Sequence, residues 1–178
     1  MDLGVISVRY ARALLKCSSL ANLEDVVYNE MQTLFQSYIL VPELRFTIDN
    51  PMLAKGKKEM LLLTACGGNP SDVTKQFIRL VLKEDRENAL YFMASSYITL
   101  YRKKKNIIRG KLITAAAVNS VTEQKMKEAV ERRTRGTVEF QTEVVPDIIG
   151  GFILEYDTYR MDASVQNKLR SILTQLKK

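Results

Sequence analysis

Paired glycines, carboxylates and a hydroxyl group lie close together between Ile148 and Leu173, where the chain most resembles a chemical site. A phosphate-binding loop needs glycines at the amino terminus of a helix, where backbone N–H groups face the anion. Gly150 and Gly151 instead precede strand-like residues, and no Lys-Ser or Lys-Thr pair follows them. Glycine in a strand more often marks a bulge or a close approach of two backbone segments, so we expect a structural role for both.

Asp162 and Ser164 could belong to a nucleophilic site, but that chemistry needs a base. The sequence has no histidine, and no lysine is spaced to replace one. Asp162 stands just before the last predicted helix, where its carboxylate can accept hydrogen bonds from the N–H groups of Ser164 or Val165. Such a cap contributes about 1 kcal/mol to stability. We therefore interpret Asp162 and Ser164 as structural residues.

The remaining candidates for chemistry are isolated. Cys17 and Cys66 fall in different helical segments and lack the spacing of metal ligands. Glu84, Asp85 and Glu87 crowd the end of a predicted helix, where a solvated turn is the usual explanation. We expect no catalytic residue, no metal ligand and no cofactor.

The composition indicates a folded chain. The 178 residues are 46% hydrophobic and include only four prolines and eight glycines, which favours one domain or two small ones over long disordered stretches. No apolar run approaches the roughly 18 residues that cross a bilayer. Arg9 and Arg12 interrupt the first apolar segment too early for a signal peptide, and two cysteines without ligand spacing fit a reducing compartment. We expect a soluble, intracellular protein.

The net charge of +7 is concentrated in one short segment. Residues 102–111 contribute +6 of it, from Arg102, Lys103, Lys104, Lys105, Arg109 and Lys111. A solvated junction between domains explains such a run, and an acidic protein partner is a second explanation. A third is a small nucleic-acid- or phosphate-binding protein that uses residues 102–111, although interleaved aromatic residues and a recognisable reading motif are missing.

The first hundred residues have the periodicity of helices. Helices are predicted over 4–18, over 22–40, after Pro42, over 54–66 and 72–84, and over about 88–104. Gly67-Gly68 is the expected stop of the fourth helix, and Ser71 or Asp72 can cap the fifth. Six helices with short connections predict a compact bundle.

The period changes after residue 106. Strands are predicted over 107–118, over 137–145 and over 148–157, with a helix from Ser120 to about Thr134 and a last helix whose apolar stripe is Val165, Leu169, Ile172, Leu173 and Leu176. The first two strands are expected to run parallel through a crossover helix, and the next pair to form an antiparallel hairpin. The predicted fold class is therefore α+β, with a six-helix bundle over 1–105 and a small β-α-β-β-α domain over 106–178.

Two helices of the first part carry more apolar residues than a single buried stripe requires. The first helix has more than one apolar face, and "FIRLVL" places apolar residues around most of the fifth. Both helices could be central in the bundle. Alternatively, they flank a groove that accepts an amphipathic helix of a partner.

Several segments of the chain resemble one known family. They are "RYARALL", "NPML", "FIRLVLKEDRENAL", "ITAAAVNSVTEQ" and, most specifically, "PDIIGGFILEYDTYRMDASVQNKLRSIL". In this order and spacing they resemble the delta subunit of the bacterial F-type ATP synthase, whose mitochondrial relative is the oligomycin-sensitivity-conferring protein. The resemblance covers essentially the whole chain. Asp85-Arg86 departs from it, because Gly-Arg is common after the fifth helix in the family.

The resemblance implies a non-catalytic stator subunit without cofactor or metal. Such a subunit joins the catalytic head to the peripheral stalk, so that the head resists the rotor's torque during proton-driven ATP synthesis. It would lie at the cytoplasmic face of a bacterial inner membrane, attached to the membrane only indirectly through the complex, and would not bind nucleic acid.

The resemblance also implies two partners. The amino-terminal bundle would receive the amino-terminal helix of an alpha subunit between its first and fifth helices, and the carboxy-terminal domain would meet the b subunits of the peripheral stalk. The residues that match the groove for the alpha subunit are Tyr10, Ala13, Leu14, Phe77, Leu80 and Val81.

Overall fold

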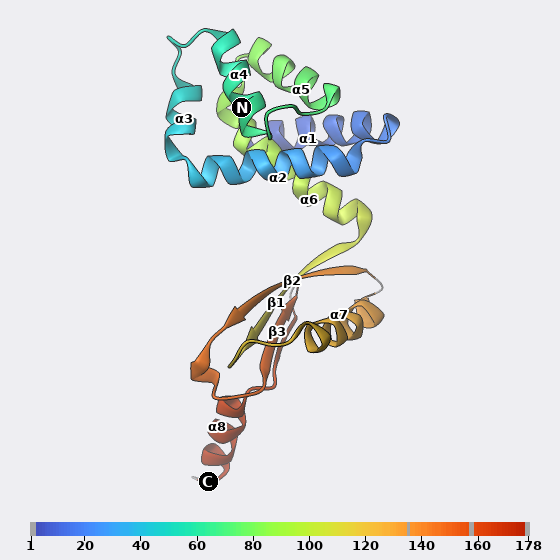
Figure 1. Cartoon of the computed structure of the whole chain (residues 1–178), viewed down its shortest axis with the longest axis vertical. Coiled ribbons are helices and arrows are strands. Elements are labelled where there is room, and N and C mark those ends of the chain that lie inside the picture. The colour runs from blue at the N-terminus through green and yellow to red at the C-terminus, as the bar shows by residue number, and fades with distance from the viewer. Residues whose placement is uncertain (1–2, 135, 157–158, 177–178) are drawn as a thin grey trace. The chain divides into compact units, whose positions relative to one another are not determined.

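The computed structural model describes residues 3–134, 136–156 and 159–176. The chain divides into two compact units, Met1–Lys103 and Lys104–Lys178. The first is helical and the second is built on a sheet (Figure 1). The mixed α+β class predicted from the sequence is confirmed.

The amino-terminal unit holds helices in every segment where the periodicity predicted one. They are α1 (Leu3–Leu20), α2 (Glu24–Leu40), α3 (Pro42–Asp49), α4 (Lys55–Ala65), α5 (Asp72–Lys83) and α6 (Leu90–Lys105), with a short 3-10 turn η1 (Glu87–Ala89) before α6. Pro42 stands in the first turn of α3, where its missing N–H costs no helical hydrogen bond. Gly67 and Gly68 follow α4 with positive φ, as a helix stop requires.

The start of α5 is fixed by a carboxylate from α2. Ser71 caps the helix, with its Oγ accepting a hydrogen bond from the Thr74 N–H at 3.4 Å. The hydroxyls of Ser71 and Thr74 both donate to Glu30 Oε2, at 2.9 and 2.6 Å. Because an anion is favoured at a helix amino terminus, Glu30 holds α5 in place against α2.

The core of the amino-terminal unit is made of large apolar side chains from several helices. The fully buried ones include Val27, Met31, Leu34, Ile48, Leu62, Ile78, Val81, Leu90, Met93 and Tyr97. Burying each such side chain contributes about 1.5–3 kcal/mol relative to leaving it exposed. The Tyr97 hydroxyl is hydrogen-bonded to Ser18 Oγ at 2.9 Å, which satisfies both polar groups inside the core.

The turn after α5 accommodates the Asp85-Arg86 departure from the family pattern. Asp85 adopts a left-handed φ of 53°, a conformation that Asp and Asn tolerate better than most residues. The Arg86 N–H donates to the Val81 carbonyl at 3.1 Å. This is the hydrogen bond of a Schellman motif, which usually has glycine at the left-handed position. The Asp85 carboxylate lies 2.6 Å from Lys55 Nζ.

The carboxy-terminal unit is a four-stranded sheet within the described residues. Its elements are β1 (Ile107–Thr114), α7 (Ser120–Thr134), β2 (Thr137–Val144), the 3-10 turn η2 (Pro146–Ile148), β3 (Phe152–Tyr156), β4 (Tyr159–Asp162) and α8 (Val165–Leu176). The strand order is β2-β1-β3-β4. The predicted parallel pairing of β1 and β2 through the crossover helix α7 is confirmed, and β3 runs antiparallel to both β1 and β4.

The predicted hairpin between the second and third strands is wrong. The third strand begins at Phe152 rather than Ile148, and residues 145–151 form a connection longer than the usual hairpin loop. η2 and a left-handed Ile149 lie in this connection, and β3 pairs on the other side of β1. The hairpin instead connects β3 and β4. The predicted order β-α-β-β-α therefore lacks one strand, β4.

The end of β1 also differs from the prediction. β1 ends at Thr114 rather than Val118, and Asp157, the predicted end of the third strand, lies outside the described residues. Strand β4 was not predicted because it spans only four residues, all of them exposed.

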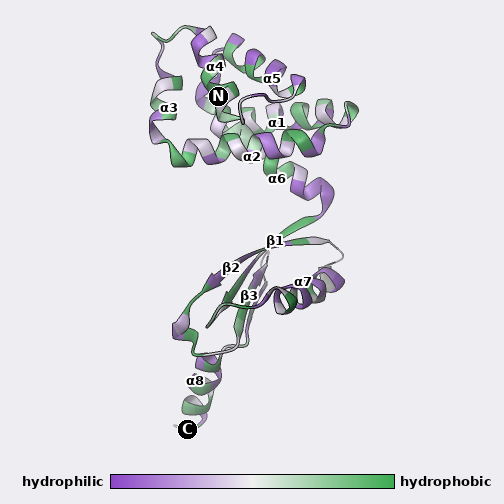
Figure 2. Cartoon of the chain, viewed as in Figure 1, coloured by the Kyte–Doolittle hydropathy of each residue, from purple (hydrophilic) through white to green (hydrophobic). Residues whose placement is uncertain are grey.

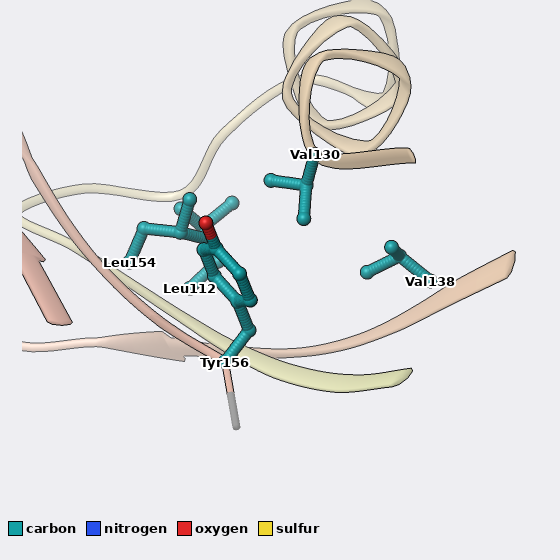
Figure 3. Packing of buried hydrophobic residues seen from close by; sticks show 5 residues of the cluster. All are labelled: Leu112, Val130, Val138, Leu154 and Tyr156. Atoms are coloured by element: carbon teal, nitrogen blue, oxygen red, sulfur yellow. The ribbon is translucent and has the colours of Figure 1, made fainter. Parts of the chain in front are cut away.

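One face of the sheet packs on α7. Leu112, Val138, Leu154 and Tyr156 come from three adjacent strands and form a buried cluster with Val130 of α7 (Figure 3). The strand period of two places the alternate residues on the opposite face. That face is charged, with Lys111 on β1 beside Glu143 on β2.

The paired glycines allow a close approach between two backbone segments. Gly151 has a φ of 75°, and a Cβ atom at this position would lie 2.2 Å from the carbonyl oxygen of Ala163. The Gly150 carbonyl accepts the Val165 N–H at 2.9 Å, and the Ala163 N–H donates to Phe152 O at 2.9 Å. These contacts join the start of β3 to the start of α8.

Gly151→Ala is expected to lower the free energy of unfolding by roughly 2–4 kcal/mol, because it combines a left-handed φ with a backbone collision. The measurement is urea unfolding followed by circular dichroism. Gly56→Ala is the control, since Gly56 lies in α4 with open space around its Cβ position, and it should leave stability unchanged or raise it by up to about 1 kcal/mol. Equal losses in the two variants would contradict this role for Gly151.

Candidate protein-binding surfaces

Helices α1 and α5 pack against each other through the residues predicted to line a groove. Leu14, Phe77 and Val81 are buried in the core, with Val81 fully inaccessible. The ring of Tyr10 meets Phe77 edge-on, with centroids 6.4 Å apart. The predicted set therefore includes three residues that hold the two helices together.

The other members of the predicted set are partly or largely open to solvent. Leu80 is 48% exposed, Ala13 is exposed and Tyr10 is half-buried. Ile6 lies seven residues before Ala13, and Val73 lies seven before Leu80, so each helix presents an apolar pair about two turns apart. We call Ile6, Tyr10, Ala13, Val73 and Leu80 the α1–α5 surface.

Tyr10 is held in a fixed orientation on this surface. Arg86 Nη1 donates to the Tyr10 hydroxyl at 2.9 Å. The Arg86 guanidinium carbon also lies 5.4 Å from the centroid of the Tyr10 ring, within the range of a cation–π contact. A fixed aromatic side chain loses little conformational freedom when a partner binds.

The apolar residues of "FIRLVL" divide into a buried group and one exposed leucine. Phe77, Ile78, Val81 and Leu82 are buried in the core, whereas Leu80 is left exposed. The core therefore accounts for four of the five apolar residues of this segment, and Leu80 is the one exposed to solvent.

The basic run from 102 to 111 is divided among several local contacts. Arg102 Nε donates to the Tyr28 hydroxyl at 2.8 Å, and its guanidinium lies 5.6 Å from that ring. Lys111 Nζ lies 2.5 Å from Glu143 Oε2, and this hydrogen bond holds the pKa of Lys111 above its usual range. Arg102 and Lys111 are therefore engaged within the protein, which weakens the interpretation of the run as a phosphate-binding patch.

Helix α8 has the predicted apolar stripe, but the stripe is exposed. Its members are Val165, Leu169, Ile172, Leu173 and Leu176, whose exposed fractions run from 37% to 78%. Figure 2 shows hydrophobic and hydrophilic residues alternating along α8. The sequence indicated the stripe correctly and gave no sign that the carboxy-terminal unit leaves it uncovered.

A second apolar surface on the carboxy-terminal unit was missed by the sequence reasoning. A hollow of about 380 Å³ lies between α7 and the β3–β4 hairpin, lined by Met126 and Val130 on one side and by Tyr159 and Met161 on the other. It depends on β4, whose four residues gave no strand signal.

Asp162 and Ser164 form a hydrogen-bond network at the start of α8. Asp162 Oδ1 accepts from the Ser164 hydroxyl at 2.6 Å and from the Ser164 N–H at 3.0 Å. These bonds lower the pKa of Asp162, the hydroxyl contributing most. Ser164 Oγ in turn accepts from the Asn167 N–H at 3.1 Å, and so caps the helix.

Within the described residues, no group of three or more His, Cys, Asp or Glu side chains is placed to hold a metal ion. Among the same residues, none of the helices combines the length and the apolar character that a membrane span needs.

Each of the two units leaves apolar helical residues exposed, a feature of the class of proteins that bind other proteins. Comparison with known proteins agrees with this class. The family model described as ATP synthase delta (OSCP) subunit matches residues 6–176. The chain belongs to the ATP synthase delta (OSCP) subunit family.

Individual relatives cover almost the whole chain. ATP synthase subunit delta of Phocaeicola vulgatus is 46% identical over 176 residues, which are 98% of this chain and 95% of the relative. The same subunit of Bacteroides fragilis is 40% identical over 177 residues, with the same coverage. A chain in the structure of the Toxoplasma gondii mitochondrial ATP synthase hexamer shares the fold, with a TM-score of 0.65, 20% identity and 97% coverage of both chains.

The family resemblance seen in the sequence is therefore confirmed. Delta (OSCP) subunits are structural stator components of the ATP synthase and not catalytic subunits, which agrees with the non-catalytic role predicted from the sequence.

Ser164→Ala is expected to raise the pKa of Asp162 towards its ordinary value, because the variant lacks the hydroxyl that donates to the carboxylate. A lowered pKa in the folded state means that the ionised carboxylate stabilises the fold above the ordinary pKa of Asp, and that this stabilisation is lost as the pH falls below it. The variant should also lose about 1 kcal/mol through the missing cap. Carbon-13 NMR titration of the Asp162 carboxyl measures the pKa, with Ser171→Ala on α8 as the control. An unchanged pKa in Ser164→Ala would contradict the assignment.

Proposed function

We propose that this chain is the stator subunit that joins the catalytic head of an F-type ATP synthase to the peripheral stalk. In this proposal residues 1–105 form a six-helix bundle that binds the head, and residues 106–178 form the domain that binds the stalk. The chain would act at the cytoplasmic face of a bacterial inner membrane and be attached to that membrane only through the complex.

The observation that carries the proposal is the exposed apolar surface along the junction of α1 and α5. Its occupant is the amino-terminal helix of an alpha subunit, as the family resemblance implies. An amphipathic helix presents apolar residues every three or four positions, and the pairs Ile6/Ala13 and Val73/Leu80 offer complementary contacts about 10 Å apart along each helix. Beneath them Leu14, Phe77 and Val81 already pack in the free protein, so binding requires little rearrangement.

The stalk contact is assigned to the apolar stripe of α8. Val165, Leu169, Ile172 and Leu176 follow each other at intervals of four, three and four residues, the spacing of a coiled-coil seam. Helices of the stalk b subunits are the partner that the family resemblance implies. The hydrogen bonds and glycine contacts that fix the start of α8 would transmit force from the stalk to the sheet.

Leu80→Asp in the full chain is expected to weaken binding of a peptide of the alpha subunit's amino-terminal helix by at least about thirtyfold, as for a charge buried in an interface hot spot. Isothermal titration calorimetry measures the affinity. Leu61→Asp is the matched control, because Leu61 is a helical leucine on α4 with 40% of its surface exposed. Equal binding by wild type, Leu80→Asp and Leu61→Asp would place the contact elsewhere.

Leu169→Asp is expected to abolish binding of the soluble portion of the stalk b subunits while leaving the alpha-subunit peptide bound, because Leu169 lies in the middle of the exposed stripe. Leu80→Asp should show the opposite pattern, so each variant controls for the folding of the other. Surface plasmon resonance with immobilised full-length chain measures both partners. Stalk binding that survives Leu169→Asp would exclude the α8 stripe as the contact.

A further inference from the structure

The α1 helix carries three cations and no acidic residue. Arg9, Arg12 and Lys16 are all exposed, and the helix spans Leu3–Leu20 without an Asp or Glu. Among the described residues no ion pair within 4 Å involves any of the three. Like charges three or four residues apart destabilise a helix by a few tenths of a kcal/mol, so this row lacks an evident stabilising role inside the protein.

The helical geometry places Arg9 and Lys16 along the border of the α1–α5 surface and Arg12 farther around α1. The contact between Tyr10 and Phe77 shows which sides of the two helices face each other. Ala13 lies next to Tyr10 around α1, and Arg9 and Lys16, four residues before and three after Ala13, lie next on the outer side. Arg12 adjoins them.

The border on α5 carries one cation, Lys83, and one carboxylate, Glu84, which lies four residues after Leu80. The residues four before and three after Leu80 are Gln76 and Lys83, both exposed. The acidic residues of this region lie at the ends of the helix: Asp72 in its first turn, 3.6 Å from Lys75, and Glu84 just after its last residue. A helix bound between α1 and α5 therefore meets an apolar strip whose cations lie mainly on the α1 side.

We propose that the helix accepted by the α1–α5 surface carries a row of carboxylates on the flank that faces α1, and that Arg9, Arg12 and Lys16 select and steer it. The inference rests on the proposed function and defines the chemistry of that partner: an amphipathic helix with an acidic flank. A partner helix with a basic flank is rejected because it would bring like charges together.

The cations of α1 and the apolar residues of the α1–α5 surface control different steps of binding. Exposed charges act over about a Debye length and raise the rate of association, and added salt screens them. The apolar contacts at Leu80 and Ala13 form only at short range and determine mainly the rate of dissociation. The cations should therefore affect the association rate and its salt dependence much more than the lifetime of the complex.

The test measures association and dissociation rates by stopped-flow fluorescence between the full chain and a labelled peptide of the alpha subunit's amino-terminal helix, at several salt concentrations. The flank variant is Arg9→Glu, Arg12→Glu and Lys16→Glu together. The control variant is Lys57→Glu, Lys103→Glu and Lys125→Glu together. These exposed lysines lie on three other helices, and the variant changes the net charge by the same amount as the flank variant.

The flank variant is expected to lower the association rate at low salt by at least about tenfold and to remove most of its salt dependence. Its dissociation rate should change by less than about threefold, and the control should stay within about threefold of wild type in both rates. A second peptide with glutamine in place of each Glu and Asp should bind wild type with the slow, salt-independent association of the flank variant.

The remaining outcomes would each contradict this inference, and one of them would also contradict the proposed site. An unchanged association rate in the flank variant, with binding still lost in Leu80→Asp, would overturn the role of the cations and leave the proposed site intact. Equal effects of the flank and control variants would show that only net charge matters, which also overturns it. No binding by folded wild-type chain would refute the α1–α5 site and this inference together.

Discussion

The packing of α1 against α5 is the contact on which the rest of the amino-terminal unit depends. Leu14, Phe77 and Val81 close the core where the two helices meet, and the start of α5 is tied to α2 by Glu30. Ala13 and Leu80 each stand one residue before a buried member of this contact, and both stay exposed. In the proposed function, stability and binding are therefore divided between neighbouring residues, so that the proposed binding surface can be altered without opening the core.

The carboxy-terminal unit applies the same division to a different architecture. The central strand β1 pairs on both sides and buries Leu112 under α7, while α8 contributes no buried residue. What fixes α8 is its first turn, through the contacts of Gly150 and Gly151 and the network of Asp162 and Ser164. A helix that is anchored at one end and apolar along one side suits a subunit that must transmit load to a partner without catalysing a reaction.

Local signals predicted the helical half well because its elements are specified by nearby residues. Pro42, Ser71 and the Gly67-Gly68 pair start or stop helices through their own backbone chemistry. The sheet was harder to predict, since strand pairing is decided by residues far apart in the sequence. The connection after β2 looked like a hairpin turn, yet it leads to the other side of β1, and the four residues of β4 are too few for a period to be visible.

The sequence by itself determined the family, the helix boundaries, the α+β class and which residues are apolar, because these depend on residue type and spacing along one segment. Only the tertiary structure decided which apolar residues are exposed. Leu80 and Val81 are adjacent and equally apolar, yet one is 48% exposed and the other is fully buried. The α8 stripe has the spacing of a buried face and remains uncovered. Burial depends on which neighbouring element covers a face, and that is a property of the packed chain rather than of any one segment.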